Sequence, residues 1–439
     1  MNPFVSIARV RSVRFRDPED RRRRRIEHAE RAWRGREALR HTRRPITVFP
    51  GPAAVAAWPQ RVVTMALAVI GLFSIGAMAA SRADAAGRHG HARDASVTCR
   101  QDLRLPVALA PGQPAAYSVT GELCSTPAER HDGRSVQLLI PGATYDHRYW
   151  DFGTIDGRRY SYARDVSALG YPTFALDMFG TGDSSTPPSN QVTIDATAFV
   201  AHQAVQALRD GRVAGIRFGK VIEVGHSLNS IAIWQEAITY QDVNGVILTG
   251  VAHSIAARFA QLAGTDFYPA SMDPEFAGRG LDSGWLTTVP GVRGTLFYSP
   301  GDADAAVIAA DEAGKGLVSA TELNTGVPLV PTNGTLAIRA PVLDILGSDD
   351  LTTCGPNPQG HVFDCSSGAA VAAQETPFYS PEAHIHGCVI PGSGHDVSLA
   401  LNNWLQVDDA VRWSNAYVGI GRGQRDHDGL PRNCGSEGG

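Results

Sequence analysis

The feature that most limits what this chain can fold into is an apolar run, Val221–Val224, that ends in Gly225-His226-Ser227. Helix-compatible sequence follows at once, which is the pattern of a buried strand, a tight turn and a helix. A serine at such a turn presents its hydroxyl at the carboxyl edge of a sheet, where a substrate can reach it. Asn229 stands where a glycine usually completes the turn, so we expect unusual local packing there.

Other short apolar runs recur along the chain, and most of them end in glycine-rich turns. They cover residues 103–109, 115–123, 135–140, 172–177, 243–249, 341–346 and 385–390. Runs of this length without alternation are typical of strands buried on both faces of a parallel sheet. Helical periodicity lies between them, over residues 195–209, 228–240 and 397–417. The sequence therefore predicts an α/β fold with a mostly parallel central sheet flanked by helices.

The alternation of runs and helices is interrupted once, between residues 253 and 338. This aromatic-containing stretch is too long for a simple loop, so we expect it to form helices of its own. We interpret it as a cap inserted over the carboxyl edge of the sheet, with a lateral surface excursion as the alternative. The core would then comprise residues 98–252 and 339–439, preceded by a disordered linker at 86–97.

The N-terminal part has the pattern of an export signal. Residues 62–80 are apolar and uncharged, Arg61 precedes them, and A-x-A sequences occur at 77–79 and 83–85. This predicts a signal peptide at 62–85 and a secreted protein, with a membrane anchor at 62–80 and an external catalytic domain as the alternative. The arginine-rich extension at 1–61 is compatible with an artefact of start-site choice.

Charge is distributed unevenly along the chain. Residues 1–50 hold 15 Arg and 6 acidic residues, whereas residues 86–439 hold 23 basic and 37 acidic residues. A main body with this acidic excess is not expected to bind nucleic acid.

Six cysteines all follow the apolar segment, at positions 99, 124, 354, 365, 388 and 434. An even number confined to the exported part indicates disulfides formed in an oxidising compartment. We predict sequential pairs, Cys99–Cys124, Cys354–Cys365 and Cys388–Cys434, with buried free thiols as the alternative. No cysteine or histidine cluster has zinc-ligand spacing, so neither a metal nor a cofactor is expected.

A serine nucleophile needs a base, and the base needs an orienting acid. Two strand-end turns supply both: residues 347–350 contain Asp349 and Asp350, and residues 391–396 contain His395. We predict a triad of Ser227, Asp350 and His395, in that chain order, with Asp349 as the alternative acid.

A tetrahedral oxyanion also needs two backbone N–H donors. Leu228 follows the nucleophile directly, and Ala143 lies in the glycine-containing turn after the run at 135–140. We predict that these two residues form the oxyanion hole. Tyr145 and His226 are candidate substrate-binding residues. Tyr145, His147 and Trp150 are equally compatible with anchoring the loop, and His226 with packing.

Five ordered motifs, IPGATYDHRYWD, LDMFGTGDS, GHSLNS, LGSDD and PGSGHD, resemble those of the α/β-hydrolase superfamily. The resemblance is to secreted bacterial and fungal serine hydrolases of the lipase/esterase type, and it covers about residues 98–420. It implies Ser227 as nucleophile and His395 as base, and the G-x-x-D register favours Asp350 as the acid. Pro141 and Asn229 depart from the family pattern.

The sequence therefore predicts a secreted carboxylic-ester hydrolase acting on a small-molecule or lipid ester. An acyltransferase, thioesterase, lactonase or peptidase would use the same triad. A non-catalytic binding scaffold is a third hypothesis, and Asn229 is its only support. The residues do not define the acyl chain length or the oligomeric state.

Overall fold

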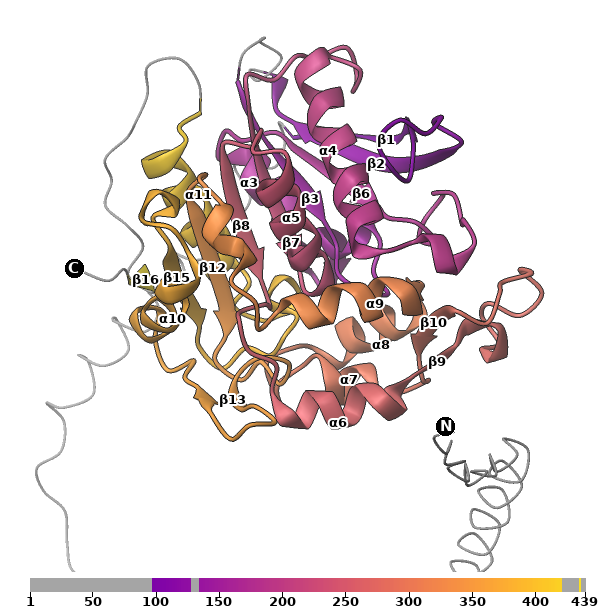
Figure 1. Cartoon of the computed structure of the whole chain (residues 1–439), viewed down its shortest axis with the longest axis vertical. Helices are drawn as coiled ribbons and strands as arrows, with labels where there is room; N and C mark the ends of the chain where they lie inside the picture. The colour runs from indigo at the N-terminus through magenta and orange to yellow at the C-terminus, as the bar shows by residue number, and fades with distance from the viewer. Residues whose placement is uncertain (1–96, 128–133, 421–433, 436–439) are drawn as a thin grey trace, which may run out of the picture. The chain divides into compact units, whose positions relative to one another are not determined.

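The computed structural model describes residues 97–127, 134–420 and 434–435. Within these residues the main element is a nine-stranded sheet with the strand order β1-β2-β6-β3-β7-β8-β12-β15-β16 (Figure 1). The strands are β1 (Thr98–Val107), β2 (Tyr117–Ser125), β3 (Ser135–Ile140), β6 (Thr173–Asp177), β7 (Lys220–His226), β8 (Gly245–Thr249), β12 (Val342–Gly347), β15 (His386–Ile390) and β16 (Cys434–Gly435). Neighbours are parallel from β6 to β15, and β1, β2 and β16 add antiparallel edges. The predicted mostly parallel sheet is confirmed.

The central strands are buried on both faces, as their unalternating apolar sequences predict. In β3, Leu138 and Leu139 are both fully buried but belong to two different hydrophobic clusters, one on each face of the sheet. The same division occurs in β7 between Val221 and Ile222.

Four helices cover the two faces of the sheet. Residues of α4 (Ile194–Asp210) and α5 (Leu228–Thr239) belong to one cluster, and those of α3 (Tyr162–Ala168) and α11 (Trp404–Tyr417) belong to the other. The helix predicted from residue 397 begins only at 404, after a short 3-10 turn at Val397–Leu399. In this stretch the Asn403 amide donates to the carbonyl of Ser398, a local bond that competes with helix formation.

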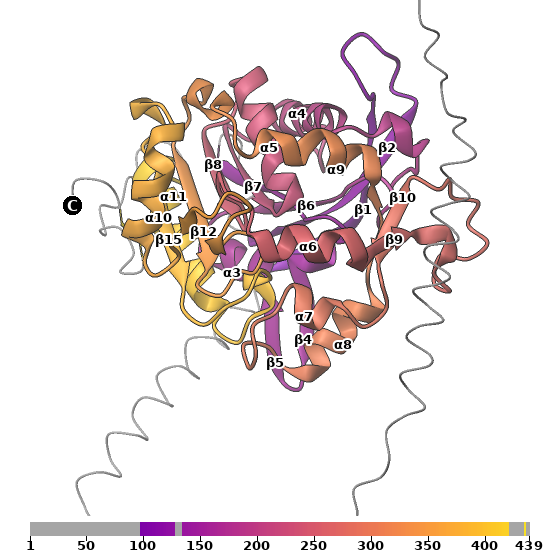
Figure 2. The ribbon, with the colours of Figure 1, turned by 60° about the horizontal axis from the view of Figure 1, so that its bottom comes forward.

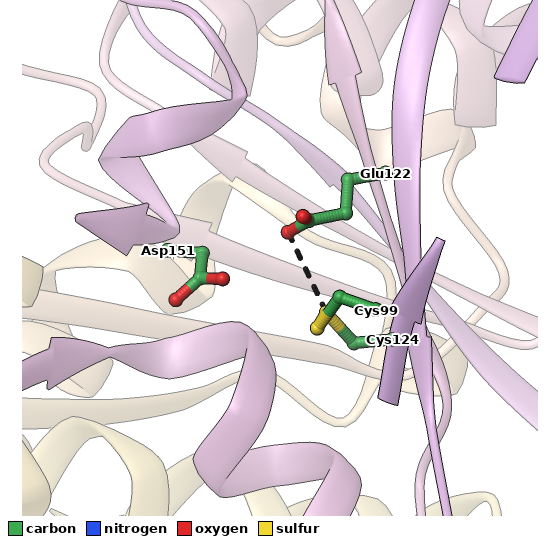
Figure 3. A group of neighbouring side chains, drawn as sticks. All are labelled: Cys99, Glu122, Cys124 and Asp151. Atoms are coloured by element: carbon green, nitrogen blue, oxygen red, sulfur yellow. Dashed lines mark hydrogen bonds between the residues drawn. A yellow bond between two sulfur atoms is a disulfide. The ribbon is translucent and has the colours of Figure 1, made fainter. Parts of the chain in front are cut away.

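The three disulfides have the predicted sequential pairing. Cys99–Cys124 joins directly opposed residues of the β1–β2 hairpin, and Cys388–Cys434 joins the opposed residues of β15 and β16. Figure 3 shows Glu122 and Asp151 beside the first disulfide.

The stretch between β8 and β12 folds into small elements of its own, which gather at one end of the sheet (Figures 1 and 2). They are the helices α6 (Ala257–Asp266), α7 (Arg293–Leu296), α8 (Ala305–Ala313) and α9 (Ala320–Gly326), and the strands β9 (Phe267–Pro269), β10 (Trp285–Thr288) and β11 (Val318–Ser319). The strands form a separate sheet in the order β11-β10-β9. We call this stretch the insertion.

The remaining elements extend the loops at the strand ends. They are the hairpin of β4 (Asp151–Ile155) and β5 (Arg158–Ser161), the hairpin of β13 (Gly355–Pro356) and β14 (Val362–Phe363), and helix α10 (Gly368–Glu375). Cys354–Cys365 spans the β13–β14 hairpin.

The expectations for the extension at 1–61, the signal or anchor at 62–85 and almost all of the linker at 86–97 lie outside the described residues. Across the part of the chain that is described, no helix combines the length and the apolar character needed to span a bilayer.

Candidate active site

Ser227 occupies the turn between β7 and α5, where the backbone has φ 54° and ψ −128°. A non-glycine residue with positive φ is strained, and such strain persists only when surrounding contacts enforce it. Here the N–H of Ser227 donates to the carbonyl of Thr249 at 2.8 Å, which fixes the turn against β8. The serine is only partly buried and lines a cavity.

Asn229 ties this turn to the one that follows β3. Its amide nitrogen donates to the carbonyl of Pro141 at 2.6 Å. Gly142 then packs so closely that an added Cβ would lie 3.0 Å from Cβ of Ser227. Asn229, which replaces the usual glycine, therefore links the two turns, since glycine has no side chain to make this hydrogen bond. Its cost is a buried Asn229 Oδ1 that has no hydrogen-bond partner among the described residues.

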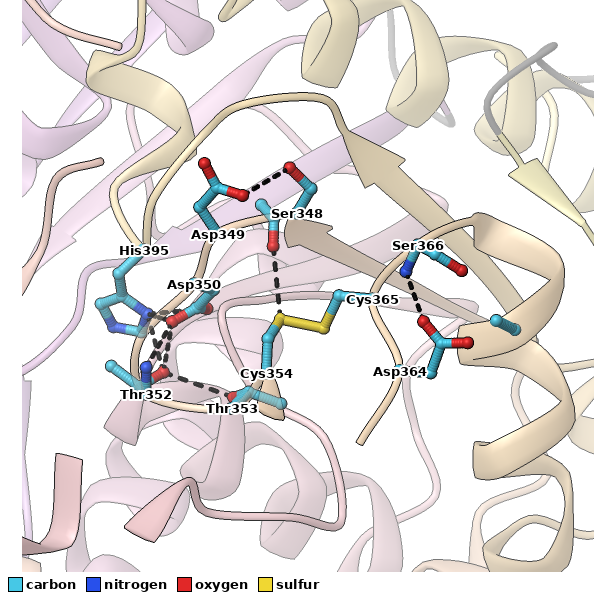
Figure 4. The surroundings of a disulfide bond; sticks show 12 residues. Ser348, Asp349, Asp350, Thr352, Thr353, Cys354, Asp364, Cys365, Ser366 and His395 are labelled. Carbon is cyan, nitrogen blue, oxygen red and sulfur yellow. Dashed lines mark hydrogen bonds and ion pairs between the residues drawn. A yellow bond between two sulfur atoms is a disulfide. The ribbon is translucent and has the colours of Figure 1, made fainter. Parts of the chain in front are cut away.

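His395 follows β15 and faces a carboxylate that follows β12. Nδ1 of His395 lies 3.0 and 3.1 Å from the two carboxylate oxygens of Asp350. The hydroxyl and the N–H of Thr352 donate to Oδ1 of Asp350 at 2.7 and 2.8 Å (Figure 4). Cys354 ends this loop: its N–H donates to the carbonyl of Asp350 at 2.9 Å, and its disulfide to Cys365 anchors it.

Burial opposes ionisation of both members of this pair, but their mutual attraction outweighs it. The pKa of Asp350 is lowered because the His395 charge and the Thr352 hydrogen bonds overcome desolvation. The pKa of His395 is raised above the usual 6.5 because attraction to Asp350 overcomes the same penalty. The arrangement thus stabilises a proton on the imidazole, as a general base requires.

Asp349, the alternative acid, is exposed and bonds instead to Ser299, whose hydroxyl donates to it at 2.8 Å. The structure therefore brings Asp350, and not Asp349, to His395.

Nε2 of His395, the nitrogen remote from Asp350, is buried and has no hydrogen-bond partner among the described residues. Space for the ring comes from Gly250, where an added Cβ would lie 2.7 Å from Cε1 of His395. Ser227 and His395 line the same cavity. The structure records no hydrogen bond between the serine hydroxyl and Nε2, and such bonds often tighten only when substrate is bound.

The two predicted oxyanion donors, Ala143 and Leu228, line the cavity as well. Neither backbone N–H donates to another described residue. Leu228 is also the first residue of α5, where the helix dipole favours negative charge. Two residues with unpaired backbone donors among the described residues thus line the cavity that Ser227 also lines.

The cavity has a volume of about 580 Å³, which suits a small organic ligand. Most of its wall is apolar and comes from the insertion, through residues that include Phe259, Phe267, Leu286, Phe297 and Leu323. A second cavity of about 340 Å³ lies around Asp177 and Lys315, has a polar wall and contains none of the predicted catalytic residues.

The candidate substrate-binding residues occupy different places. Tyr145 lines the large cavity. His226 is fully buried and does not reach that cavity, because its ring stacks on Tyr149 at 4.3 Å between centroids. His147 lines the polar cavity, and Trp150 is fully buried.

His226 forms a second histidine–aspartate pair directly behind the first, and sequence reasoning missed its partner, Asp396. The ring of His226 lies 4.6 Å from that of His395, and its Nε2 is 3.2 Å from Oδ1 of Asp396. The Thr249 hydroxyl donates to the carbonyl of Gly225, so it accepts from Nδ1 of His226 at 3.0 Å. Nε2 is then an acceptor, and the bond to Asp396 requires a protonated carboxyl.

The pKa values agree with this assignment. Burial, followed by repulsion from Asp311, raises the pKa of Asp396 to about 8. Burial, followed by the charge of His395, lowers the pKa of His226 well below 6.5. The second pair is therefore neutral near pH 7.

Arg293 of the insertion is fully buried and was not singled out by the sequence analysis. Its guanidinium binds both carboxylate oxygens of Asp311, at 2.7 and 2.9 Å, and donates to the Thr144 hydroxyl at 2.8 Å. Thr144, next to Ala143, has φ 65°, and its carbonyl accepts the N–H of Gly316 at 2.7 Å. The insertion thus holds the turn that carries one predicted oxyanion donor.

The sequence model described as "Alpha/beta hydrolase family" matches residues 137–410, which is more than half of the chain. The protein therefore belongs to the α/β-hydrolase family, and the resemblance predicted from the five motifs is confirmed. No curated protein matches the sequence significantly.

Two solved structures are similar to this chain at low sequence identity. An esterase from Thermogutta terrifontis is 15% identical with a TM-score of 0.46, and the match covers 72% of this chain and 97% of the esterase. A monoglyceride lipase from Saccharomyces cerevisiae is 16% identical with a TM-score of 0.47, covering 70% and 95%. At this level of similarity neither structure identifies a substrate.

Proposed function

We propose that the protein is a serine hydrolase that cleaves carboxylic esters with Ser227, His395 and Asp350. The observation that carries the proposal is the His395–Asp350 pair: Nε2 of His395 has no partner among the described residues, and His395 lines the same cavity as Ser227. The unpaired N–H groups of Ala143 and Leu228 on that cavity supply what an acyl-transfer transition state needs.

In the proposed reaction Oγ of Ser227 attacks the ester carbonyl, and its proton passes to Nε2 of His395. The negative charge on the former carbonyl oxygen is held by the N–H groups of Ala143 and Leu228. The C–O bond breaks, the leaving alcohol takes the proton from His395, and an acyl-serine remains. Water then attacks the acyl group while His395 again accepts a proton, and His395 returns this proton to Oγ of Ser227 as the bond to the acyl group breaks and the carboxylic acid leaves.

The cavity wall supports an apolar substrate of moderate size. A volume of about 580 Å³ and a mostly apolar lining favour burial of an acyl or alkyl group without charges. We infer that short- to medium-chain esters react faster than triglycerides with long acyl chains.

The test is a panel of p-nitrophenyl esters from acetate to palmitate, together with labelling by a fluorophosphonate probe. We expect Ser227→Ala to lose about 10⁴- to 10⁶-fold in kcat and all labelling. The matched control is Ser230→Ala. It removes a hydroxyl in the first turn of α5, three residues after Ser227, that donates to the carbonyl of Thr249. Equal labelling of wild type and Ser227→Ala would exclude Ser227 as the nucleophile.

The same panel separates the alternatives. Labelling without ester hydrolysis, together with acyl transfer to an added alcohol or thiol, identifies an acyltransferase. Absence of labelling in a folded wild-type protein favours the binding scaffold.

We also infer that the protein works in an oxidising compartment. Three disulfides that account for all six cysteines support this inference. Export is tested by expressing the full chain in a secreting host and sequencing the N-terminus of the secreted protein. Cleavage within 77–85 supports a signal peptide, and retention in membranes supports an anchor.

A further inference from the structure

A second group of titratable side chains lies away from the catalytic cavity, between α4, α5 and β7. His202 comes from α4, Glu236 from α5, Glu223 from β7, and Asp242 from the segment after α5. Helices α4 and α5 lie side by side over the sheet at this point (Figure 1). Glu223 and Glu236 are fully buried, whereas the side chains of His202 and Asp242 are about one fifth exposed.

Three of these residues have the spacing of ligands around one ion. Nδ1 of His202 lies 3.4 Å from Oε1 of Glu236 and 3.1 Å from Oδ2 of Asp242. One ligand atom from each of the three lies within 4.8 Å of the other two. Ligand atoms bound tetrahedrally to Zn²⁺ at its usual bond lengths are about 3.3 Å apart. Small side-chain movements would therefore place them around one cation.

An independent observation is the number of buried acceptors left without a partner at this place. Both carboxylate oxygens of Glu223, both of Glu236 and Oδ1 of Asp242 are buried and accept no hydrogen bond from a backbone, hydroxyl or amide donor of the described residues; the carboxyl groups of Glu223 and Glu236 face only one another, Asp242 and His202. Nδ1 of His202 likewise faces only the carboxylates of Glu236 and Asp242. Buried polar atoms nearly always have a partner, so a cluster of exceptions indicates a missing water or ion.

Apart from His202, no described basic side chain is recorded in an ion pair with these buried carboxylates. Among the ion pairs recorded between described residues, Glu236 and Asp242 pair only with His202, and Glu223 has no pair. The nearby Arg209 donates to Asn244 and to the backbone carbonyl of Asp242 rather than to a carboxylate. Buried carboxylates without a cation are costly, so they must take up either protons or a metal ion.

We propose that His202, Glu236 and Asp242 bind one divalent transition-metal cation, with Glu223 behind them as a further carboxylate. An imidazole together with carboxylates suits Zn²⁺ or Mn²⁺ better than Ca²⁺ or Mg²⁺. The partly exposed His202 and Asp242 leave an entry path from solvent. The ion would join α4, α5 and the segment after α5, and α5 begins directly after Ser227. None of its ligands lines the catalytic cavity, so it takes no part in the chemistry.

Among the described residues, a second group of one histidine and two carboxylates lies around His147, but its carboxylates have hydrogen-bond partners. Around His147, the carboxylate of Asp177 accepts bonds from the His147 ring and from Thr120, and that of Asp146 binds Arg148. The two groups that contain cysteines have both sulfurs in a disulfide. We therefore do not expect these groups to bind a metal ion, and His147 serves as a control in the test.

The test uses the purified full chain, stripped with a chelator and titrated calorimetrically with Zn²⁺, Mn²⁺ and Ca²⁺. We expect one Zn²⁺ or Mn²⁺ per chain and a melting temperature raised by about 5 °C at a hundredfold excess over Kd. His202→Gln and Glu236→Gln should each weaken binding at least about tenfold. The controls are His147→Gln and His361→Gln, the latter at an exposed position between β13 and β14, and both should bind as the wild type does.

A second readout keeps the proposal testable if a variant folds poorly. Co²⁺ added to the stripped wild-type protein should give a visible spectrum of a nitrogen- and oxygen-ligated site, and Zn²⁺ should displace it. Absence of binding to the folded wild type, or binding that His147→Gln abolishes and His202→Gln does not, overturns the proposal. So does a wild-type melting temperature that does not change with metal while Glu236→Gln melts higher, because Glu223 and Glu236 would then merely share a proton.

Discussion

Two histidine–aspartate pairs lie next to each other in this protein, and they differ in protonation: one favours the charged form and the other the neutral form. His395 and Asp350 favour the ion pair, since the pKa of the histidine is raised and that of the carboxyl is lowered. His226 and Asp396 favour the neutral pair, since the histidine pKa is lowered and the carboxyl pKa is raised to about 8. All four side chains are buried, so burial does not explain the difference.

The difference lies in what surrounds each carboxylate. Asp350 accepts two hydrogen bonds from Thr352, which stabilise its charge. Asp396 accepts one hydrogen bond from the Tyr145 hydroxyl and is repelled by Asp311. Donors that favour the charged form lower a carboxyl pKa, whereas burial and a like charge raise it. Identical residue types thus give one charged pair and one neutral pair, and the following predictions test this contrast.

The largest effect is expected from exchanging each aspartate for asparagine. Asp350→Asn should lower kcat about 10⁴-fold, because an amide cannot stabilise the imidazolium and favours the wrong tautomer. Asp396→Asn should lower it less than about tenfold, because an amide reproduces the hydrogen bonding of a neutral acid. Steady-state ester hydrolysis at pH 7.5 measures both, with exposed Asp349→Asn as the control for Asp350. Equal losses for the two asparagine variants would contradict the assignment of protons.

The second pair should matter for stability through its link to the insertion. Tyr145 contacts Asp311 as well as Asp396, and Arg293 compensates the charge of Asp311. Arg293→Met leaves Asp311 buried without a cation and should lower the free energy of unfolding by about 3–5 kcal/mol.

Urea unfolding under non-reducing conditions measures the loss. The matched control is Arg412→Met, which removes a half-exposed pair with Asp408 and should cost about 0–1 kcal/mol. A loss for Arg293→Met no larger than for Arg412→Met would show that the network does not hold the insertion in place.

Sequence reasoning could predict the parts of this contrast that depend on local pattern. The apolar runs specify the strands, and each glycine-rich turn falls at a strand end, so Ser227, Asp350 and His395 were expected at one edge of the sheet. The sequential disulfides were predictable for a similar reason, since Cys99 and Cys124 flank a single hairpin.

The residues that separate the two pairs could not be predicted, because their roles depend on contacts between distant segments. Arg293 and Thr144 are 149 positions apart, and Tyr145 and Asp396 are 251 apart. Thr352 is the exception: a hydroxyl two residues after a predicted catalytic aspartate was a usable local signal. The place of His226 could not be predicted either, because its adjacency to Ser227 does not determine on which face of β7 its side chain lies.

A smaller effect is expected from Thr352, which favours the charged form of Asp350. Thr352→Val removes the hydroxyl bond to Oδ1 but keeps the backbone N–H bond, so Asp350 remains only partly supported. Loss of one hydrogen bond to a charged group costs about 1.5–3 kcal/mol, which corresponds to a fall in kcat of about 10- to 150-fold. Thr352→Ser retains the hydroxyl and should stay within about threefold of wild type. Ester hydrolysis at saturating substrate distinguishes the two, and a matching loss in both would assign Thr352 a packing role.

The smallest effect concerns the pH profile, where the two pairs should be independent. Protonation of His395 removes the base, so kcat/KM should fall as pH decreases through a pKa above 6.5. Because burial raises the pKa of Asp396 to about 8, this carboxyl is mostly uncharged below pH 7, so its raising effect on the His395 pKa is small there and Asp396→Asn should move the limb by less than about 0.3 units. A shift of a full unit to lower pH would mean that Asp396 is ionised beside His395, since an anion there raises the histidine pKa. While Asp396 is neutral, the His226–Asp396 pair therefore places no charge beside His395.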